Sequence, residues 1–107
     1  MGKPHPWTSA YATVEIRRIA ASDKLTLIWT RHAREQMADR SLYSGDVLYV
    51  LKQGFVLNSG TVSTRPGFYR YAVQSRSPNS GSRTVAIVCI PDPDQTQIKV
   101  VTVMWVD

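Results

Sequence analysis

Two histidines and nine arginines are the side chains with which this chain could move protons or hold a phosphate group. His32 stands near the start of a predicted helix, and Gln36 and Arg40 follow it on roughly the same helix face. Histidine exchanges protons near neutral pH, and arginine stabilises negative charge on a phosphate. If Thr30 caps the helix, free backbone N–H groups near His32 also attract anions. The spacing therefore predicts a phosphate site in which the neutral His32 ring could accept a proton.

His32 has a second interpretation that the sequence leaves open. The imidazole would hydrogen-bond a backbone carbonyl and fix the turn into the helix, while Arg40 would cap the helix or pair with a carboxylate such as Asp46. One histidine without a second titratable partner does not decide between the two roles. His5 is a weak partner, because it lies between two prolines in an expected extended tail over residues 1–7.

Arg70 is the second candidate for a phosphate contact. It stands between Tyr69 and Tyr71 in a predicted strand, so alternation sends the arginine to the opposite sheet face from both tyrosines. Arg70 could bind phosphate while nearby aromatic rings stack on bases, or it could be a solvated arginine beside two core tyrosines. Arg83 opens the next predicted strand and could join Arg70 across the ladder.

Thr102 is a polar residue in the apolar last strand, where it is expected on the face of Val100 and Met104. Its hydroxyl could reach the site, although threonine is also a good strand former. Cys89 is expected in the core, and no Cys/His cluster has the spacing of metal ligands, so we predict neither a metal nor a cofactor. The candidate catalytic residues are His32, Arg40, Arg70 and Thr102, and the candidate nucleic-acid-binding residues are Arg34, Gln36, Tyr69, Tyr71 and Arg83.

The positive charge is concentrated in one part of the chain. The 107 residues include 13 Lys+Arg against 8 Asp+Glu, for a net charge of +5. No carboxylate occurs between Asp46 and Asp92, whereas five basic residues do. An arginine-rich basic surface favours an anionic partner, which here means RNA, the ribosome or an acidic protein.

The elements that must position these residues follow from periodicity and turn residues. A first helix is expected within residues 8–22, and two short helices follow. One begins at Arg31, and the other has Ser44 as its N-cap and ends at a left-handed Gly54. Strands are predicted at residues 25–30, 55–58, 68–75, 83–90 and 98–106. This order predicts one α+β domain over residues 1–107, with an antiparallel sheet packed on helices.

A soluble cytoplasmic protein is expected from what the sequence lacks. The single cysteine excludes an internal disulfide, and neither a signal peptide nor an apolar run of membrane-spanning length occurs. We therefore expect no association with a membrane.

The segment Thr30–Arg40 reads T-x-H-A-x-x-x-M-x-x-R, and a second motif, D-V-x-x-V-L-x-x-G, follows over Asp46–Gly54. Strand segments at Tyr69–Tyr71 and Val100–Val103 complete the pattern. Together these residues resemble the domain-of-unknown-function family 4258, a group related to the RelE/ParE-like toxins. The resemblance runs from about residue 25 to residue 105, and Ser41 departs from it at a position where glycine commonly follows the arginine.

The resemblance implies a RelE-like β-α-α-β-β-β-β core over residues 25–106, with helices on one sheet face and a concave site on the other. Relatives in the superfamily cleave RNA without a metal or act as toxins that an antitoxin neutralises. Two functions are therefore expected. One is a toxin-like, metal-independent endoribonuclease that inhibits translation, and the other is a non-catalytic binding module that holds RNA or an acidic, antitoxin-like protein.

Overall fold

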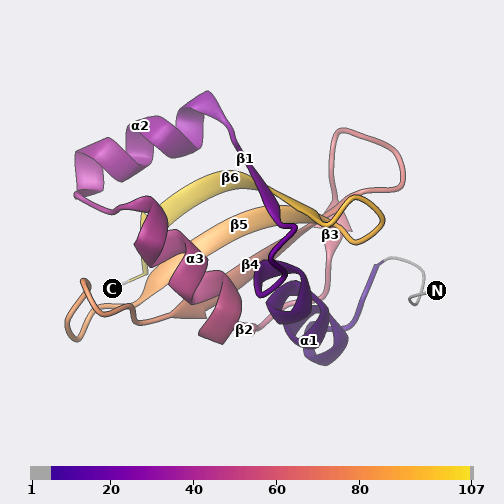
Figure 1. Ribbon diagram of the computed structural model, residues 1–107, viewed down its shortest axis with the longest axis horizontal. Helices are drawn as coiled ribbons and strands as arrows, with labels where there is room; N and C mark the ends of the chain where they lie inside the picture. Colours follow the sequence, from indigo (N-terminus) through magenta and orange to yellow (C-terminus); the bar gives the residue numbers. More distant parts are fainter. Residues whose placement is uncertain (1–5, 107) are drawn as a thin grey trace.

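The computed structural model describes residues 6–106 and confirms the expected α+β class. The helices are α1 (Ser9–Ala20), α2 (Arg31–Arg40) and α3 (Ser44–Gln53) (Figure 1). The strands are β1 (Thr26–Trp29), β2 (Phe55–Val56), β3 (Thr61–Val62), β4 (Tyr69–Ser75), β5 (Val85–Asp92) and β6 (Gln97–Trp105). The sequence does not predict β3, because two residues carry no readable alternation. His5 lies outside the described residues.

The sheet is mixed, whereas the sequence predicts an antiparallel one. Its strands are ordered β1-β6-β5-β4-β2, and β3 pairs with β4 next to β2. β1 runs parallel to β6, with Thr26 opposite Gln97 and Trp29 opposite Val100, and the other pairs are antiparallel. Strand direction depends on the whole path of the chain, so local turn and alternation patterns could not show that the first strand lies beside the last.

The core lies between the helices and one face of the sheet. α1 packs on α3, α3 packs on β4 and β5, and α2 packs on β6. Side chains that are fully buried fill the space between these layers, among them Ile16, Ile19, Val47, Leu51, Val73, Ile87, Ile98 and Val103. Among residues 6–106, no helix has the length and apolar character needed to cross a membrane.

Trp7 belongs to the core and not to an extended surface tail. Its side chain is 2% exposed, and its ring stacks on that of Tyr71 with 5.5 Å between centroids. The Trp7 backbone N–H donates to the Tyr71 hydroxyl at 2.9 Å, which satisfies that buried oxygen. Burial raises the pKa of Tyr71, and this hydrogen bond opposes the shift. Two prolines predict an extended backbone before Trp7, but its large apolar surface decides where the ring lies.

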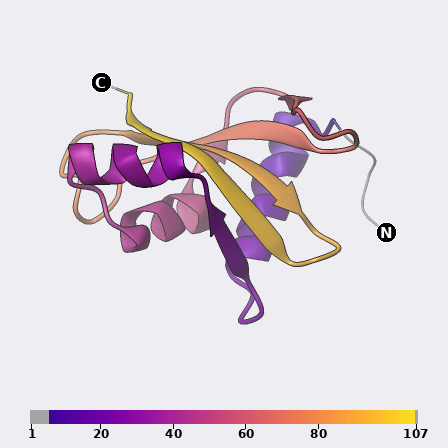
Figure 2. The same ribbon diagram turned by 90° about the horizontal axis from the view of Figure 1, so that it is seen from above.

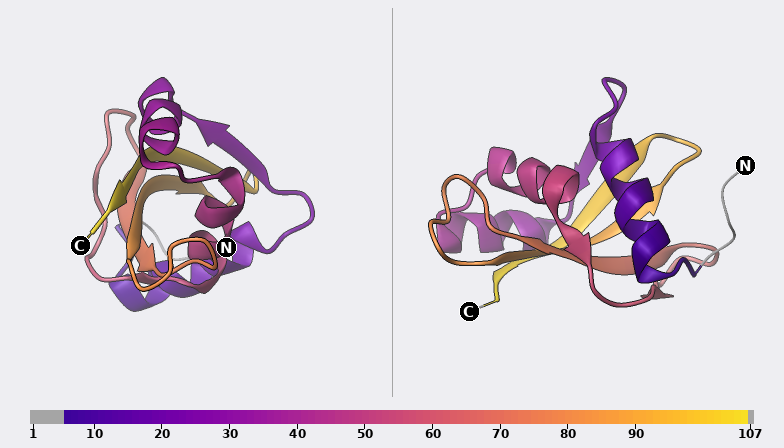
Figure 3. Two further views of the ribbon diagram at one scale, coloured as in Figure 1. Left: turned by 90° about the vertical axis from the view of Figure 1, so that its left-hand side faces the viewer. Right: turned by 90° about the horizontal axis from the view of Figure 1, so that it is seen from below.

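Threonine side chains in or next to the helices hydrogen-bond to backbone groups at both edges of the sheet, where α2 and α1 lie (Figure 3). Thr30, the predicted N-cap of α2, accepts from the Ala33 N–H (3.0 Å) and donates to the Val101 carbonyl of β6 (3.1 Å). At the other edge, the Thr13 hydroxyl of α1 accepts from the Val56 N–H of β2 (2.8 Å). Both helices therefore satisfy backbone groups that an unpaired strand edge would expose.

Gly54 ends α3 in an extended conformation (φ −81°, ψ 179°), so the prediction of a left-handed glycine is wrong. The residue is needed for space instead, because a Cβ atom there would lie 2.5 Å from the Val50 carbonyl oxygen and 2.8 Å from that of Gln74. Arg17 of α1 donates to the carbonyls of Gln53 and Gly54, both at 3.0 Å. These contacts hold the end of α3 against β4 and α1.

The start of α3 differs slightly from the prediction. Tyr43 is the N-cap, and Ser44 is the first helical residue. Asp46 in the first turn accepts from the Tyr43 N–H (2.9 Å) and from the Ser77 hydroxyl (2.8 Å). The buried Asp46 carboxylate therefore ties the start of α3 to the loop between β4 and β5, and it does not pair with Arg40.

A bulge in β6 changes which side chains reach each face of the sheet. Val88 is opposite Thr102 and Cys89 is opposite Val100, so Val101 is an extra residue. Val100 is buried in the core, and Thr102 consequently lies on the other face. The expectation that both share a face is wrong, because alternation assumes a strand without a bulge.

Ser41 is the C-cap of α2 and has φ 54° and ψ 40°, the left-handed region in which glycine is favoured. We expect S41G to raise the free energy of unfolding by about 0.5–1 kcal/mol, because relief of backbone strain outweighs the extra freedom of glycine in the unfolded chain. Urea denaturation measures the change. Ser82, an exposed loop residue without positive φ, provides the control, and a gain in S82G as large as in S41G would contradict the explanation.

Cys89 is fully buried, and burial raises the pKa of its thiol to about 12 from an ordinary 9.0. The contribution of the protonated Cys89 thiol to the free energy of unfolding is fully present below pH 9.0 and is lost as the pH rises towards about 12. We expect C89A to be less stable than the parent at pH 8, and the difference to narrow by about 1.4 kcal/mol per pH unit above pH 9. Urea denaturation at pH 8, 9 and 10 tests this. If the free energies of unfolding of the two proteins changed in parallel with pH, ionisation of the Cys89 thiol would not affect stability and the prediction would be wrong.

Candidate nucleic-acid interface

The sheet face turned away from α3 carries a hollow that is lined by cations. Side chains that alternate with the buried ones reach this face, among them Arg70 of β4 and Lys99 of β6. β3 and the loop around it lie on the same side (Figure 2). The hollow has a volume of 160 Å³ and is lined by Thr30, Ser63, Thr64, Arg70, Ile90, Lys99 and Val101.

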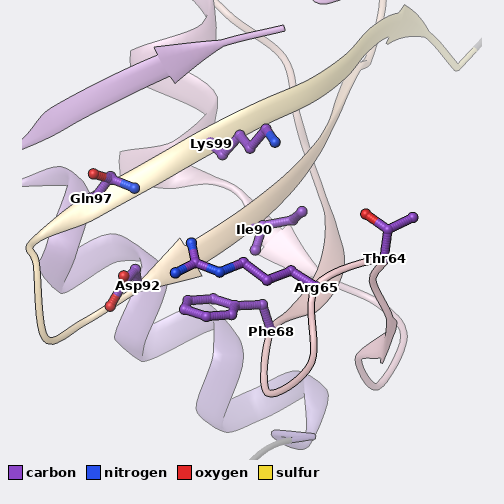
Figure 4. Close-up of a pocket in the computed structure, with 7 residues that line it drawn as sticks. All are labelled: Thr64, Arg65, Phe68, Ile90, Asp92, Gln97 and Lys99. Atoms are coloured by element: carbon purple, nitrogen blue, oxygen red, sulfur yellow. The ribbon is translucent and has the colours of Figure 1, made fainter.

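Two further hollows share residues with the first. One has a volume of 240 Å³ and is lined by Asn58, Ser59, Thr61, Arg70, Tyr71, Ala72 and Val88. The other, shown in Figure 4, is lined by Thr64, Arg65, Phe68, Ile90, Asp92, Gln97 and Lys99. We call the three together the basic groove, because the cations of Arg65, Arg70 and Lys99 line it.

Arg70 joins two of these hollows. It is exposed, while Tyr71 is buried on the other face, as alternation predicts. The guanidinium Nη2 donates to the Val62 carbonyl at 3.2 Å, which holds the side chain beside β3. Its other N–H groups have no hydrogen bond or ion pair within residues 6–106, so they can bind an anion.

A tight turn between β3 and β4 positions Arg65. The Ser63 hydroxyl donates to the Phe68 carbonyl (2.7 Å) and accepts from the Arg65 N–H (3.2 Å), and Gly67 completes the turn with φ 83°. The Arg65 guanidinium carbon lies 4.3 Å from the centroid of the Phe68 ring (Figure 4). This cation–π stack presents a flat, positively charged surface in the groove.

None of the three residues in the predicted stripe, His32, Gln36 and Arg40, lines the basic groove. His32 is exposed, is not among the lining residues of the basic groove, and has no hydrogen-bond partner within residues 6–106. The Gln36 Oε1 atom accepts from the Val103 N–H of β6 at 2.8 Å. Arg40 is half-buried and makes no ion pair in that range. The turn into α2 is fixed by Thr30, a role that the sequence offered to His32.

Arg34 lies away from the basic groove. It lines a separate hollow of 240 Å³ together with Trp29, Met37 and Ser44. None of these four residues lines the basic groove. Arg34 is therefore not one of the cations of the basic groove.

Burial changes the roles expected of the tyrosines. Tyr71 is 2% exposed with its ring in the core, and Tyr69 packs against the same core. The Tyr71 ring is therefore closed to stacking on a base, and the half-buried Tyr69 does not line the basic groove. The accessible aromatic ring of the groove is that of Phe68.

Arg83 lies at the other end of the sheet from Arg70. The register pairs Tyr71 with Cys89, so Arg70 stands beside Ile90, seven residues along the chain from Arg83. The Arg83 guanidinium lies over the Trp105 ring at 4.0 Å. The proposed pair of arginines is therefore not formed, and the register of this hairpin could not be read from its sequence.

The sequence did not single out Arg65 or Lys99 as individual site residues. The stretch without carboxylates was a partial signal, since it contains Arg65 and Arg70, but Lys99 lies outside it and Arg76 and Arg83 do not line the groove. Alternation along β6 alone could have placed Lys99 opposite the core. Thr102 reaches the same sheet face opposite Val88, but it does not line the groove.

The chemistry that the basic groove supports is the binding of an anion. Three cations and the hydroxyl groups of Thr30 and Thr64 line it, with Asp92 as its one carboxylate. Among the described residues, no group of three or more His, Cys, Asp or Glu side chains is arranged to hold a metal ion. The groove holds no histidine, so it offers phosphate contacts without a partner for proton transfer near neutral pH.

Comparison with known proteins yields one match. Residues 29–105 match the family described as Domain of unknown function (DUF4258). No curated protein and no solved structure matches the chain. The matched residues include every side chain that lines the basic groove.

The Gln36 contact predicts a structural effect. In Q36A the N–H of the buried Val103 loses its acceptor, and we expect the free energy of unfolding to fall by about 1–2 kcal/mol. Q36E keeps a side-chain oxygen at the same distance from the backbone, so its free energy of unfolding should fall less than that of Q36A. Urea denaturation of both variants measures the effect, and equal losses would show that the hydrogen bond does not cause them.

Proposed function

This chain belongs to the family described as Domain of unknown function (DUF4258), and we propose that it binds single-stranded RNA in the basic groove. The observation that carries the proposal is the convergence of Arg65, Arg70 and Lys99 from three different segments on one hollow face of the sheet. Phosphate contacts from such cations dominate the affinity of proteins for nucleic acids.

The shape of the groove favours a single strand over a duplex. The groove crosses from β4 to β6, which is two strand spacings or about 10 Å. Its aromatic ring, Phe68, lies under a guanidinium, and unstacked bases bind to such flat surfaces. A folded acidic protein could meet the same cations, but it presents no unstacked bases that would lie flat on the guanidinium. The combination of cations with a stacking platform is therefore better suited to RNA.

Cleavage of the bound RNA is a second candidate, and one observation favours it. Thr30 lines the groove, and His32 lies two residues further on in the first turn of the same helix. His32 itself does not line the groove. A toxin-like endoribonuclease would need His32 to approach the RNA once it is bound, whereas binding alone needs only the three cations.

We expect R70A and K99A each to weaken binding of a short oligouridine several-fold, because each removes a cation from the groove. Each should also reduce the slope of log affinity against log salt by about 0.7 if it removes one phosphate contact. Fluorescence anisotropy at several salt concentrations provides both numbers. R76A and K52A are matched controls, since both remove exposed cations that lie outside the groove.

Equal losses in the control and groove variants would contradict the proposal, because they would reflect net charge alone. Gel analysis of the same RNA separates the two candidates. If the RNA stays intact, the protein binds RNA without cleaving it. If the parent protein produces fragments and H32A does not, the protein is also an endoribonuclease that needs His32. Expression of the parent and H32A in a bacterial host, followed by growth and total RNA, extends the same distinction to cells.

A further inference from the structure

We infer that the end of the basic groove formed by Arg65, Phe68, Asp92 and Gln97 binds a guanine base of the RNA. This inference rests on the proposed function, because it concerns which base occupies part of the same groove. The four side chains line one hollow and gather around its opening in Figure 4. Each supplies a different part of base recognition.

The stacking surface is the first part. The Arg65 guanidinium lies on the Phe68 ring, and Ser63 fixes the turn that carries both residues. A guanidinium held flat in this way can stack on a base with its free face. Stacking alone accepts every base, so it positions the nucleotide without selecting it.

Asp92 is the part that selects. A carboxylate repels phosphates, so at this end of an RNA groove it favours a ligand group that offers N–H donors. Its Oδ1 atom accepts from the Gln95 N–H at 3.3 Å, and within residues 6–106 the side chain has no ion pair, not even with Arg65. The carboxylate therefore has acceptor capacity left for a ligand.

Guanine is the base whose donors fit a carboxylate. Its Watson–Crick edge carries two adjacent donors, N1–H and the exocyclic N2 amino group, which together can bind both carboxylate oxygens. Adenine and cytosine place one amino group beside an acceptor nitrogen, and uracil places one N–H between two carbonyls. Among the four neutral bases, therefore, only guanine can make a bidentate contact with the Asp92 carboxylate.

Gln97 provides a donor for the remaining group on the Watson–Crick edge of guanine, the O6 atom. It is the residue directly opposite Asp92 in the β5–β6 ladder, so the two side chains lie next to each other on one sheet face. The Gln97 side chain has no hydrogen-bond partner within residues 6–106, and its amide can donate to the guanine O6 atom. The hollow is small, with 60 Å³, so it admits the edge of the base while the rings lie against Arg65.

The experiment compares pentaribonucleotides that differ only at the central base. We expect the parent protein to bind UUGUU about tenfold more tightly than UUAUU, UUCUU or UUUUU, in line with the discrimination of a bidentate contact. The same RNA with central inosine lacks the N2 amino group and should lose most of this preference. Fluorescence anisotropy at one fixed salt concentration provides the affinities.

Asp92→Asn tests the selecting group. The amide keeps one acceptor and adds a donor that faces a donor of guanine, so we expect the preference for UUGUU to vanish while binding of UUUUU stays the same or rises. Asp94→Asn is the matched control, because it removes an exposed carboxylate two residues away that does not line the groove. D94N should keep the full preference.

The outcomes separate this inference from the proposed function. Equal affinity of the parent for all five RNAs, or a guanine preference that persists in D92N, would overturn the guanine site and leave RNA binding in place. Absence of binding to any of the RNAs would overturn the proposed function itself. A guanine preference that D92N and inosine remove, and D94N keeps, would support the site.

Discussion

The fold depends on how the edge of β6 is satisfied after β1 ends at Trp29. β6 continues beyond this point, and its free backbone groups would otherwise have no partner on that side. α2 replaces the missing strand, with Thr30 on the Val101 carbonyl and Gln36 on the Val103 N–H. The motif over Thr30–Arg40 therefore includes, in Thr30, a residue that holds a helix on a sheet edge.

This attachment also bears on the site. Thr30 sits at the bulge of β6, where the extra residue Val101 turns the following side chains to the other face. Both residues line the basic groove together with Lys99. The same few contacts thus satisfy the sheet edge and shape one wall of the groove. A change at Thr30 would consequently affect folding and binding together, so it cannot report on binding alone.

The sequence predicted the helices well but did not predict which residues line the basic groove, and the physical reasons differ. Thr30 was identified as a cap because capping is local and depends on a few residues. The opposite faces of Arg70 and Tyr71 followed from alternation in an unbroken strand. Lys99 and Arg65 were not predicted, because they come to the same groove only through the order of the strands in the sheet and the conformation of the turn between β3 and β4. Such contacts join residues far apart in the chain, and no local pattern encodes them.

The pairing of β1 with β6 has a consequence for how the protein is made. These are the first and last strands, so the sheet gains its final edge only when residues 97–105 have been synthesised. Until then the helix that follows β1 has no strand to dock on, and the apolar face of the early segments stays open to solvent. Long-range parallel pairing of this kind slows folding and leaves a nascent chain exposed to aggregation. The order of strands therefore makes this small domain dependent on its last strand, and a ribosome that stalled before β6 would hold an unfinished sheet.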